Sequence, residues 1–342
     1  MIRATMSLRP LLALASLIAV VLPAQAGDRE ARQWLERMSD TLANRNYEGR
    51  FFHLRQARSE SLRIIHRVDK GKITERLVSL DGSGREIIRN EAEVVCYLPD
   101  KRTVLVEKRA DDSSLITTVP SYNERLEEHY SIDSGPLTKA FGRRTKVILV
   151  QPRDQFRYGY RLWLDYETAM PLQSQLFDRN GNVIEQILFA EVNFRERIPA
   201  DSMKPAVSGE GFAWLRQDPQ QRTAGMQPGW NVIRLPPGFR LTTWRLQQMP
   251  GSKATVRHFV YSDGLASVSL FIEPRSPQAQ PINGLSRVGA SFVFSRNIDD
   301  VQLVVVGEVP PQTLEVIAEG VTREAVKGGP VPAQQAGTPP QP

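Results

Sequence analysis

The chain has 342 residues, of which 41% are hydrophobic and 24% charged, so it is long enough for two domains and is not disordered throughout. A single cysteine excludes an internal disulfide and any metal site that needs several cysteines. The formal net charge of +6 is modest and diffuse, and we therefore expect no nucleic-acid partner.

The N-terminus has the pattern of a cleavable secretory signal peptide. Arg3 and Arg9 precede an apolar run over residues 11–22, and Ala24-Gln25-Ala26 then supplies an A-x-A cleavage site. The run is shorter than the ~20 apolar residues of a membrane-spanning helix, which makes a membrane anchor the weaker interpretation. We expect cleavage after Ala26 and export into an oxidising compartment. The lone Cys96 lies far from the new N-terminus, so it offers no site for lipid attachment there.

The predicted elements begin with one helix and continue as a long series of strands. Asp28 is the candidate N-cap. Five apolar residues follow at helical spacing, namely Ala31, Trp34, Leu35, Met38 and Leu42. The strand candidates are short, alternating and separated by tight turns, which predicts antiparallel pairing. They cover residues 47–56, 62–69, 72–80, 85–89, 93–98, 103–107, 145–151, 158–165, 172–178 and 182–194, with a short helix near 122–129.

Several of these strands are apolar on one face and partly apolar on the other. Over residues 182–194 one face carries Ile184 and Leu188. The opposite face still carries Ile187 and Phe189. A half-exposed antiparallel sheet is cleanly polar on its outer face, so this excess needs an explanation. A strongly curved sheet around helices, or an apolar cleft, explains it as well as a covered second face does.

The regular pattern stops over residues 198–228, where prolines and glycines recur, and we interpret this segment as a linker. The first domain then covers residues 27–197 and a smaller domain residues 229–322. A tail over residues 323–342, mostly uncharged and rich in Pro and Gly, predicts disorder. The strands expected in the small domain cover 231–235, 241–246, 254–261, 267–273, 290–296 and 301–309, followed by a helix at 313–318.

The sequence contains no recognisable catalytic or metal-binding motif. It lacks the G-x-S-x-G, H-E-x-x-H, P-loop and G-x-G-x-x-G patterns. Cys96 alternates onto one face of a predicted strand, like a buried thiol. His53 and His66 fall on neighbouring predicted strands and could face each other, although a solvent-facing or hydrogen-bonded histidine is the ordinary interpretation. We therefore expect no enzyme, no cofactor and no metal, and we expect a binding protein instead.

The kind of ligand follows from the residues around the surplus apolar surface. Five arginines fall within two neighbouring predicted strands and their turn, namely Arg50, Arg55, Arg58, Arg63 and Arg67. An apolar cleft rimmed by guanidinium groups suits an amphiphile with an anionic head, because arginine binds phosphate bidentately. It suits equally an acidic, partly unfolded peptide that adds to a sheet edge.

Short segments along nearly the whole chain resemble the MucB/RseB family. In the first domain they are Trp34-Leu35, Tyr47-Glu48-Gly49, Ile65-His66-Arg67-Val68, Glu75-Arg76-Leu77, Pro152-Arg153-Asp154, Arg157-Tyr158-Gly159-Tyr160 and Leu162-Trp163-Leu164-Asp165. In the second they are Leu235-Pro236-Pro237-Gly238-Phe239, Tyr261-Ser262-Asp263-Gly264-Leu265-Ala266, Phe271-Ile272-Glu273-Pro274 and Val306-Gly307-Glu308-Val309-Pro310. Their combined order carries the resemblance.

The resemblance implies an α+β protein whose large domain is a LolA/LolB-like carrier fold, an unclosed, strongly curved antiparallel barrel covered by helices. It implies a periplasmic negative regulator of the envelope-stress sigma factor. Such a regulator binds the periplasmic part of a membrane-spanning anti-sigma factor of the RseA or MucA type and shields it from proteolysis. Lipopolysaccharide or another amphiphile releases it. The alternative is a periplasmic lipid or lipoprotein carrier, and a homo-oligomer is left open.

The resemblance also implies three groups of site residues. The lipid-binding candidates of the large domain, each equally well a core residue, are Phe51, Phe52, Leu54, Ile64, Leu164 and Phe189. The partner-binding candidates of the small domain, for which a core role is favoured, are Trp230, Phe239, Trp244, Tyr261 and Phe271. Arg153 and Arg157 lie in a predicted turn between strands, where they either position the domain interface or meet an anionic headgroup.

Overall fold

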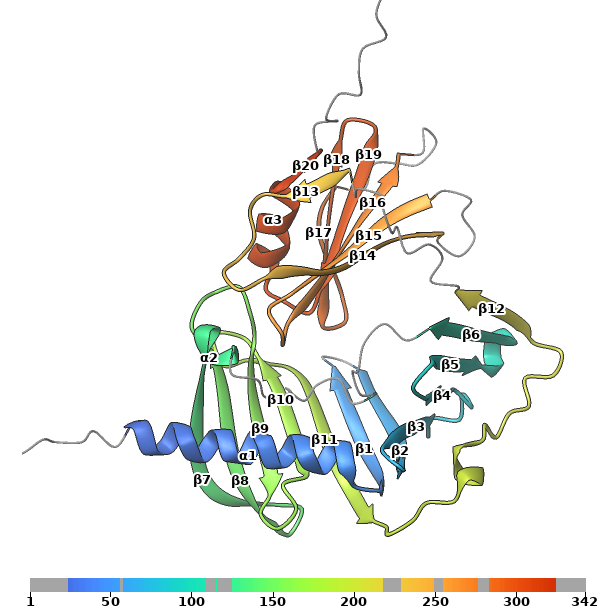
Figure 1. The fold of residues 1–342 in the computed structure, drawn as a ribbon, viewed down its shortest axis with the longest axis vertical. Coiled ribbons are helices and arrows are strands. Elements are labelled where there is room, and N and C mark those ends of the chain that lie inside the picture. The colour runs from blue at the N-terminus through green and yellow to red at the C-terminus, as the bar shows by residue number, and fades with distance from the viewer. Residues whose placement is uncertain are drawn as a thin grey trace, which may run out of the picture.

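The computed structural model describes residues 24–55, 58–108, 115, 125–217, 229–248, 255–275 and 283–323. Within these residues the strands form sheets of twelve, six and two strands. The twelve-stranded sheet is strongly curved and open, and the six-stranded sheet lies beyond one end of it (Figure 1). The predicted α+β class, with a large unclosed sheet and a smaller C-terminal domain, is confirmed. Most of the predicted signal peptide and of the tail lies outside the described residues.

Helix α1 (Ala24–Asn44) packs across one face of the large sheet, which we call the inner face (Figure 1). The predicted stripe makes this contact, since Trp34, Leu35 and Met38 are buried in one cluster with Ile148 and Leu162 of the sheet. The prediction that Asp28 caps the helix is wrong, because the helix begins a turn earlier at Ala24.

The large sheet follows the order β12-β6-β5-β4-β3-β2-β1-β11-β10-β9-β8-β7. Neighbouring strands are antiparallel except β12 and β6, which are parallel. The strands are β1 (Tyr47–Arg55), β2 (Arg58–Asp69), β3 (Lys72–Ser79), β4 (Glu86–Arg89), β5 (Glu93–Leu98), β6 (Thr103–Lys108), β7 (Tyr130–Ala140), β8 (Arg143–Pro152), β9 (Gly159–Asp165), β10 (Pro171–Phe177), β11 (Val183–Phe194) and β12 (Ala213–Gln217). The short helices are η1 (Pro99–Lys101), α2 (Leu126–His129) and η2 (Ala200–Met203).

Two strands of this sheet were not predicted. Strand β7 contains Gly135-Pro136, a dipeptide typical of turns. The pairing register of β7 with β8 shifts at this point, between Ser134 and Leu137. Proline is tolerated at this place because β7 is an edge strand with a bulge. Strand β12 falls inside the predicted linker and pairs in parallel with β6, a non-local contact that no local pattern reveals.

The surplus apolar surface has two causes. The sheet curves around α1 on its inner face, and another segment of the chain covers part of its outer face. On the inner face Phe51, Ile64 and Phe189 form a buried cluster that continues the one under α1. On the outer face the segment from Ile198 to β12 covers β2–β6, with Ile65 packed against Ile198 and Met203. A hydrogen bond also attaches this segment to the sheet, since Arg76 Nη1 of β3 donates to the Ser202 carbonyl at 3.1 Å.

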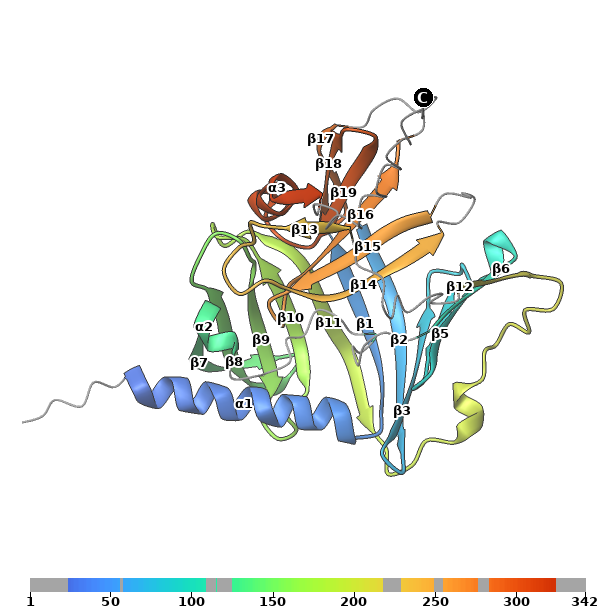
Figure 2. The same cartoon turned by 45° about the horizontal axis from the view of Figure 1, so that its top comes forward.

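The small domain is a six-stranded antiparallel sheet in the order β14-β15-β16-β19-β18-β17, with helix α3 against it (Figure 2). A two-stranded sheet, β13 with β20, completes its core. The elements are β13 (Trp230–Val232), β14 (Arg240–Gln248), β15 (Thr255–Ser262), β16 (Ser267–Pro274), β17 (Gly284–Val288), β18 (Ser291–Ile298), β19 (Val301–Gly307), α3 (Pro311–Glu319) and β20 (Val321–Arg323). The sequence did not predict β17, an exposed edge strand, or the short β20.

Candidate functional site at the domain junction

The two domains meet at one end of the curved sheet, where α2, the start of β7 and the loop between β8 and β9 approach the small domain (Figures 1 and 2). From the small domain, the loop before β14, the turn between β15 and β16 and the start of α3 take part. Polar contacts at this junction therefore join segments that are far apart in the sequence.

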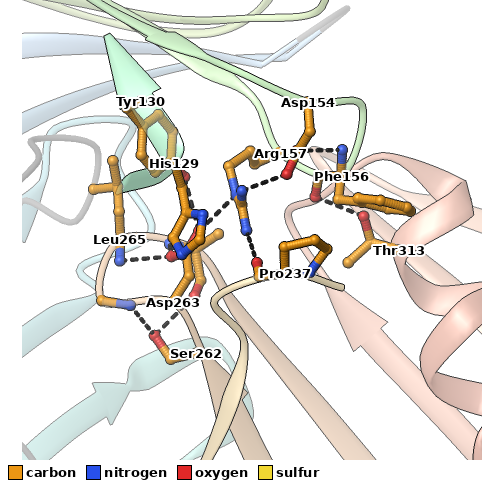
Figure 3. A network of polar contacts seen from close by, with 12 residues as sticks. His129, Tyr130, Asp154, Phe156, Arg157, Pro237, Ser262, Asp263, Leu265 and Thr313 are labelled. Carbon is orange, nitrogen blue, oxygen red and sulfur yellow. Dashed lines mark hydrogen bonds and ion pairs between the residues drawn. The ribbon is translucent and has the colours of Figure 1, made fainter. Parts of the chain in front are cut away.

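Arg157, from the loop between β8 and β9, lies at the centre of the junction with its side chain fully buried (Figure 3). Its Nη1 donates to Asp154 Oδ2 at 2.6 Å within the large domain. Towards the small domain, its Nε lies 2.8 Å from Asp263 Oδ2 and its Nη2 donates to the Pro237 carbonyl. The guanidinium carbon also lies 5.3 Å from the centre of the Phe239 ring. One cation thus links both domains.

Asp263 is buried, and its carboxylate accepts hydrogen bonds from three further donors besides its ion pair with Arg157. Its Oδ1 accepts from the backbone amides of Leu265 and Ala266 at 2.8 and 2.7 Å. Its Oδ2 accepts from the Tyr130 hydroxyl of the large domain at 3.1 Å. Burial, and after it the charge of Asp263, raises the pKa of Tyr130, so this hydroxyl keeps its proton and remains a donor.

Two further contacts fix the relative position of the domains. The Thr313 hydroxyl at the start of α3 donates to the Phe156 carbonyl at 2.6 Å (Figure 3). Gly238 has φ +81°, and a Cβ at this position would overlap the imidazole of His129. The small domain therefore approaches α2 closely only because residue 238 is a glycine.

A second polar group lies at the same junction, on β1 and β11. Glu185 is buried, with His53 Nε2 2.8 Å from its Oε1 and Arg55 Nε 2.8 Å from its Oε2. Glu308, which follows β19 of the small domain, lies 3.9 Å from Arg55. Burial, and after it the charge of Glu185, raises the pKa of Glu308. Burial raises the pKa of Tyr160, and the charges of Glu308, Asp263 and Glu185 raise it further, in that order.

The structure distributes the six lipid-binding candidates over both faces of the sheet. Phe51, Ile64 and Phe189 meet in one buried cluster of the inner face, and Leu164 is buried beneath α1. Phe52, 41% exposed, and the half-buried Leu54 lie on the outer face. Successive residues of a strand point to opposite faces, so β1 cannot bring all three of its candidates to one surface.

The partner-binding candidates separate into buried and accessible residues. Trp230, Phe239 and Tyr261 belong to the small-domain core and offer no surface in this conformation. Trp244 and Phe271 are half-buried. Their rings stack on neighbours of the same sheet, at 6.0 Å from Phe259 and 4.3 Å from His258 respectively.

The remaining residues singled out in the sequence are Arg153, His53, His66 and Cys96, and the structure places each in a separate environment. Arg153 Nε lies 3.2 Å from the carbonyls of Glu127 and Tyr130, both in the large domain. His53 and His66 do not face each other, because His53 contacts Glu185 and His66 contacts Glu75. Cys96 is only half-buried, although burial raises its pKa. The neighbouring Tyr97 is the residue of β5 that is buried.

Sequence reasoning named Arg157 but missed the other residues that join the two domains around it. Asp263, Tyr130 and Thr313 come from three separate elements, and only Asp263 lies in a segment that carries the family resemblance. Glu185 was missed as well, since a lone carboxylate in an apolar strand pattern gives no sign of its partner. No local signal pairs residues of different domains.

Two kinds of site are absent from the described residues, namely a cluster of metal ligands and a membrane-spanning helix. Within them, no three His, Cys, Asp or Glu side chains lie close enough together to bind a metal ion. No helix in this part of the chain has the length and apolar character needed to cross a membrane.

Fold and junction together define a two-domain protein whose curved sheet is closed at one end by the second domain. The family model of the MucB/RseB N-terminal domain matches residues 30–207, and that of the MucB/RseB C-terminal domain matches residues 224–322. The chain belongs to the MucB/RseB family, which confirms the resemblance seen in the sequence.

Individual relatives match along almost their whole length. The sigma factor AlgU regulatory protein MucB of Pseudomonas aeruginosa is 32% identical over 322 residues, covering 92% of this chain and 97% of the relative. The sigma-E factor regulatory protein RseB of Escherichia coli K12 is 28% identical, covering 84% and 89%.

Solved structures agree with these matches. A crystal structure of MucB in complex with MucA(peri) matches with a TM-score of 0.67 and 28% identity, covering 86% of this chain and 99% of that one. A MucA/MucB complex from Pseudomonas aeruginosa matches with a TM-score of 0.69 and 29% identity, with the same coverage.

Proposed function

We propose that this protein binds the periplasmic region of a membrane-spanning anti-sigma factor and thereby restrains the envelope-stress sigma factor. The observation that carries the proposal is the match over both domains to MucB, which has been solved in complex with MucA. The protein acts as a periplasmic binding protein and not as an enzyme, after its signal peptide is removed behind Ala26. Its bound partner is shielded from the protease that would otherwise cut it.

We propose further that an amphiphile on the inner face releases the partner. Phe51 lies on the same face of β1 as His53 and Arg55, and Phe189 on the same face of β11 as Glu185. Acyl chains that part the phenylalanine cluster would therefore shift the strands that carry the junction. By linkage, the amphiphile weakens partner binding by the same factor as the partner weakens amphiphile binding.

The candidate residues take different roles in this proposal. Phe51, Ile64, Leu164 and Phe189 receive the acyl chains, and Arg153 meets the anionic headgroup. In the small domain Trp244 and Phe271 contact the partner, because both residues are only half-buried. The buried aromatic candidates, namely Trp230, Phe239 and Tyr261, support that surface from within the core.

Calorimetry with the periplasmic segment of the anti-sigma factor from the same genome tests the proposal. We expect a stable complex, which added lipopolysaccharide dissociates, and protection of the segment from a DegS-type protease. Trp244→Ala should weaken the complex by about tenfold or more, as truncation of an interface aromatic does. Ile233→Ser, at a 67% exposed position of the same domain, serves as the matched control.

The absence of any complex with the cognate segment would refute the proposal. Passage of a bound lipid to an acceptor membrane protein, without such a complex, would favour the lipid or lipoprotein carrier instead. Equal losses of affinity in Trp244→Ala and Ile233→Ser would contradict the assignment of the partner surface.

A further inference from the structure

The hairpin between β7 and β8 ends in an exposed aromatic residue at the end of the large domain away from the small domain (Figures 1 and 2). Its two turn residues, Phe141 and Gly142, have φ values of +50° and +77°. A turn with two left-handed residues favours Asn-Gly, and a bulky side chain there is strained. Phe141 is nevertheless 51% exposed, so the fold gains little burial from it.

Next to this hairpin, arginines and aromatic rings contact one another in a row across three elements. The Arg144 guanidinium lies 4.4 Å from the Tyr166 ring centre, and Tyr166 lies 5.7 Å from Trp34. The Arg37 guanidinium in turn lies 4.3 Å from the Trp34 ring. The Tyr166 amide donates to the Arg144 carbonyl at 2.9 Å, which joins the turn after β9 to the hairpin. We call Arg37, Lys139, Phe141, Arg144 and Tyr166 the basic aromatic patch.

The exposed charges of this patch are mainly positive. Lys139, Arg144 and Arg37 are exposed. Of the two carboxylates in the turn after β9, Asp165 is buried and paired with Arg143 at 2.7 Å. Glu167 is exposed and offsets part of the positive charge. Exposed aromatic rings beside arginine and lysine match the apolar and anionic layers of a phospholipid surface.

We propose that the basic aromatic patch docks the large domain on a bilayer that contains anionic phospholipid. Phe141 enters the headgroup region, Tyr166 lies at its boundary, and Lys139, Arg144 and Arg37 contact phosphates. The small domain lies at the opposite end of the large sheet, so the junction around Arg157 stays clear of the membrane (Figure 1). Docking is weak, reversible and sensitive to salt, because a few basic residues and one inserted ring supply it.

Vesicle co-sedimentation tests this proposal with protein purified from the periplasm and shown by mass spectrometry to lack residues 1–26. We expect binding to vesicles of equal parts phosphatidylglycerol and phosphatidylcholine, loss of binding at high salt, and much weaker binding to phosphatidylcholine alone. Phe141→Asn supplies the residue that the turn favours, so it should keep or raise the melting temperature while weakening binding about tenfold. Lys139→Gln and Arg144→Gln should each weaken binding about fivefold.

Val288→Asn is the matched control, because Val288 is 67% exposed on β17 of the small domain and should leave binding unchanged. A lack of binding to anionic vesicles would overturn the proposal. This is the result expected if the surface binds a protein partner instead. Equal binding to both vesicle types, or equal effects of Phe141→Asn and Val288→Asn, would also overturn it. Phe141→Asn also distinguishes docking on a bilayer from the uptake of single lipids on the inner face. Such uptake does not depend on Phe141 and should be unchanged in this variant.

Discussion

Replacing Arg157 by methionine tests whether one buried ion pair holds the two domains together. Methionine keeps an apolar stem against Phe239 but removes the contacts to Asp263, Asp154 and the Pro237 carbonyl. Asp263 then stays buried without its cation. We expect the small domain to separate from the large one while each keeps its own core, because each of the two largest buried clusters is made of residues from one domain.

The magnitude follows from what remains around Asp263. Removing one partner of a buried pair costs about 3–5 kcal/mol. Asp263 keeps the Tyr130 hydroxyl and the amides of Leu265 and Ala266, so we expect the lower end of that range. A loss of about 3 kcal/mol shifts the equilibrium between docked and separated domains by more than about a hundredfold. Combining Arg157→Met with Asp263→Asn removes the uncompensated charge and should restore part of the loss.

Small-angle scattering and urea unfolding followed by tryptophan fluorescence measure the effect. The variant should have a larger radius of gyration and should lose the coupling between the unfolding of the two domains. Arg234→Met is the control, because the Arg234–Glu319 pair is more than half exposed on both sides and should contribute less than about 1 kcal/mol. If Arg157→Met and Arg234→Met scatter and unfold alike, the junction is not held by this pair and the reasoning fails.

Three further changes have outcomes of known direction. Burial, and after it the charge of Arg245, lowers the pKa of His258 to about 4. The free energy of unfolding should therefore fall by up to about 3 kcal/mol as the pH drops from about 6.5 towards 4. Urea titrations should show this loss in the unmodified protein and not in His258→Gln. Gly238→Ala should separate the domains through overlap with His129, raising the radius of gyration. Phe51→Ala should cost about 3–5 kcal/mol in urea unfolding, whereas Phe52→Ala should cost under about 1 kcal/mol.

Each of these changes has its own control and contrary outcome. Gly181 has φ +84° and open space around it, so Gly181→Ala reports backbone strain without overlap. If it enlarges the particle as much as Gly238→Ala does, contact with His129 is not the cause. Equal costs at Phe51 and Phe52 would contradict the assignment of the two faces of β1. A pH dependence that persists unchanged in His258→Gln would exclude that histidine as its source.

The sequence determined the elements whose signals are local. The stripe of Trp34, Leu35 and Met38 predicts the buried side of α1, since helical period alone decides which residues share a face. Strand β5 has the predicted bounds of residues 93–98. Strand β7 was missed because Gly135-Pro136 has the local chemistry of a turn, and only its place at the sheet edge makes a strand compatible with it.

The sequence also predicted apolar candidates without their surroundings. Alternation showed that Phe51 and Phe52 point apart, but not which side faces the core. The same composition suits a buried core and a binding surface, so Trp230 and Tyr261 could not be told from Trp244 until the small domain was assembled. Burial depends on all elements that pack around a residue, whereas a sequence pattern reports only its own element.

Taken alone, the sequence determined the fold class, the two-domain order and the family, because periodicity and the order of short segments are properties of the chain. Only the tertiary structure decided that Arg157 meets Asp263, that Arg55 lies close to both Glu185 and Glu308, and that β12 pairs with β6. It also placed Phe141 and the Arg144–Tyr166 pair together at one end of the sheet. The physical reason is that ion pairs, rings and strand edges act through space, between residues that no spacing along the chain connects.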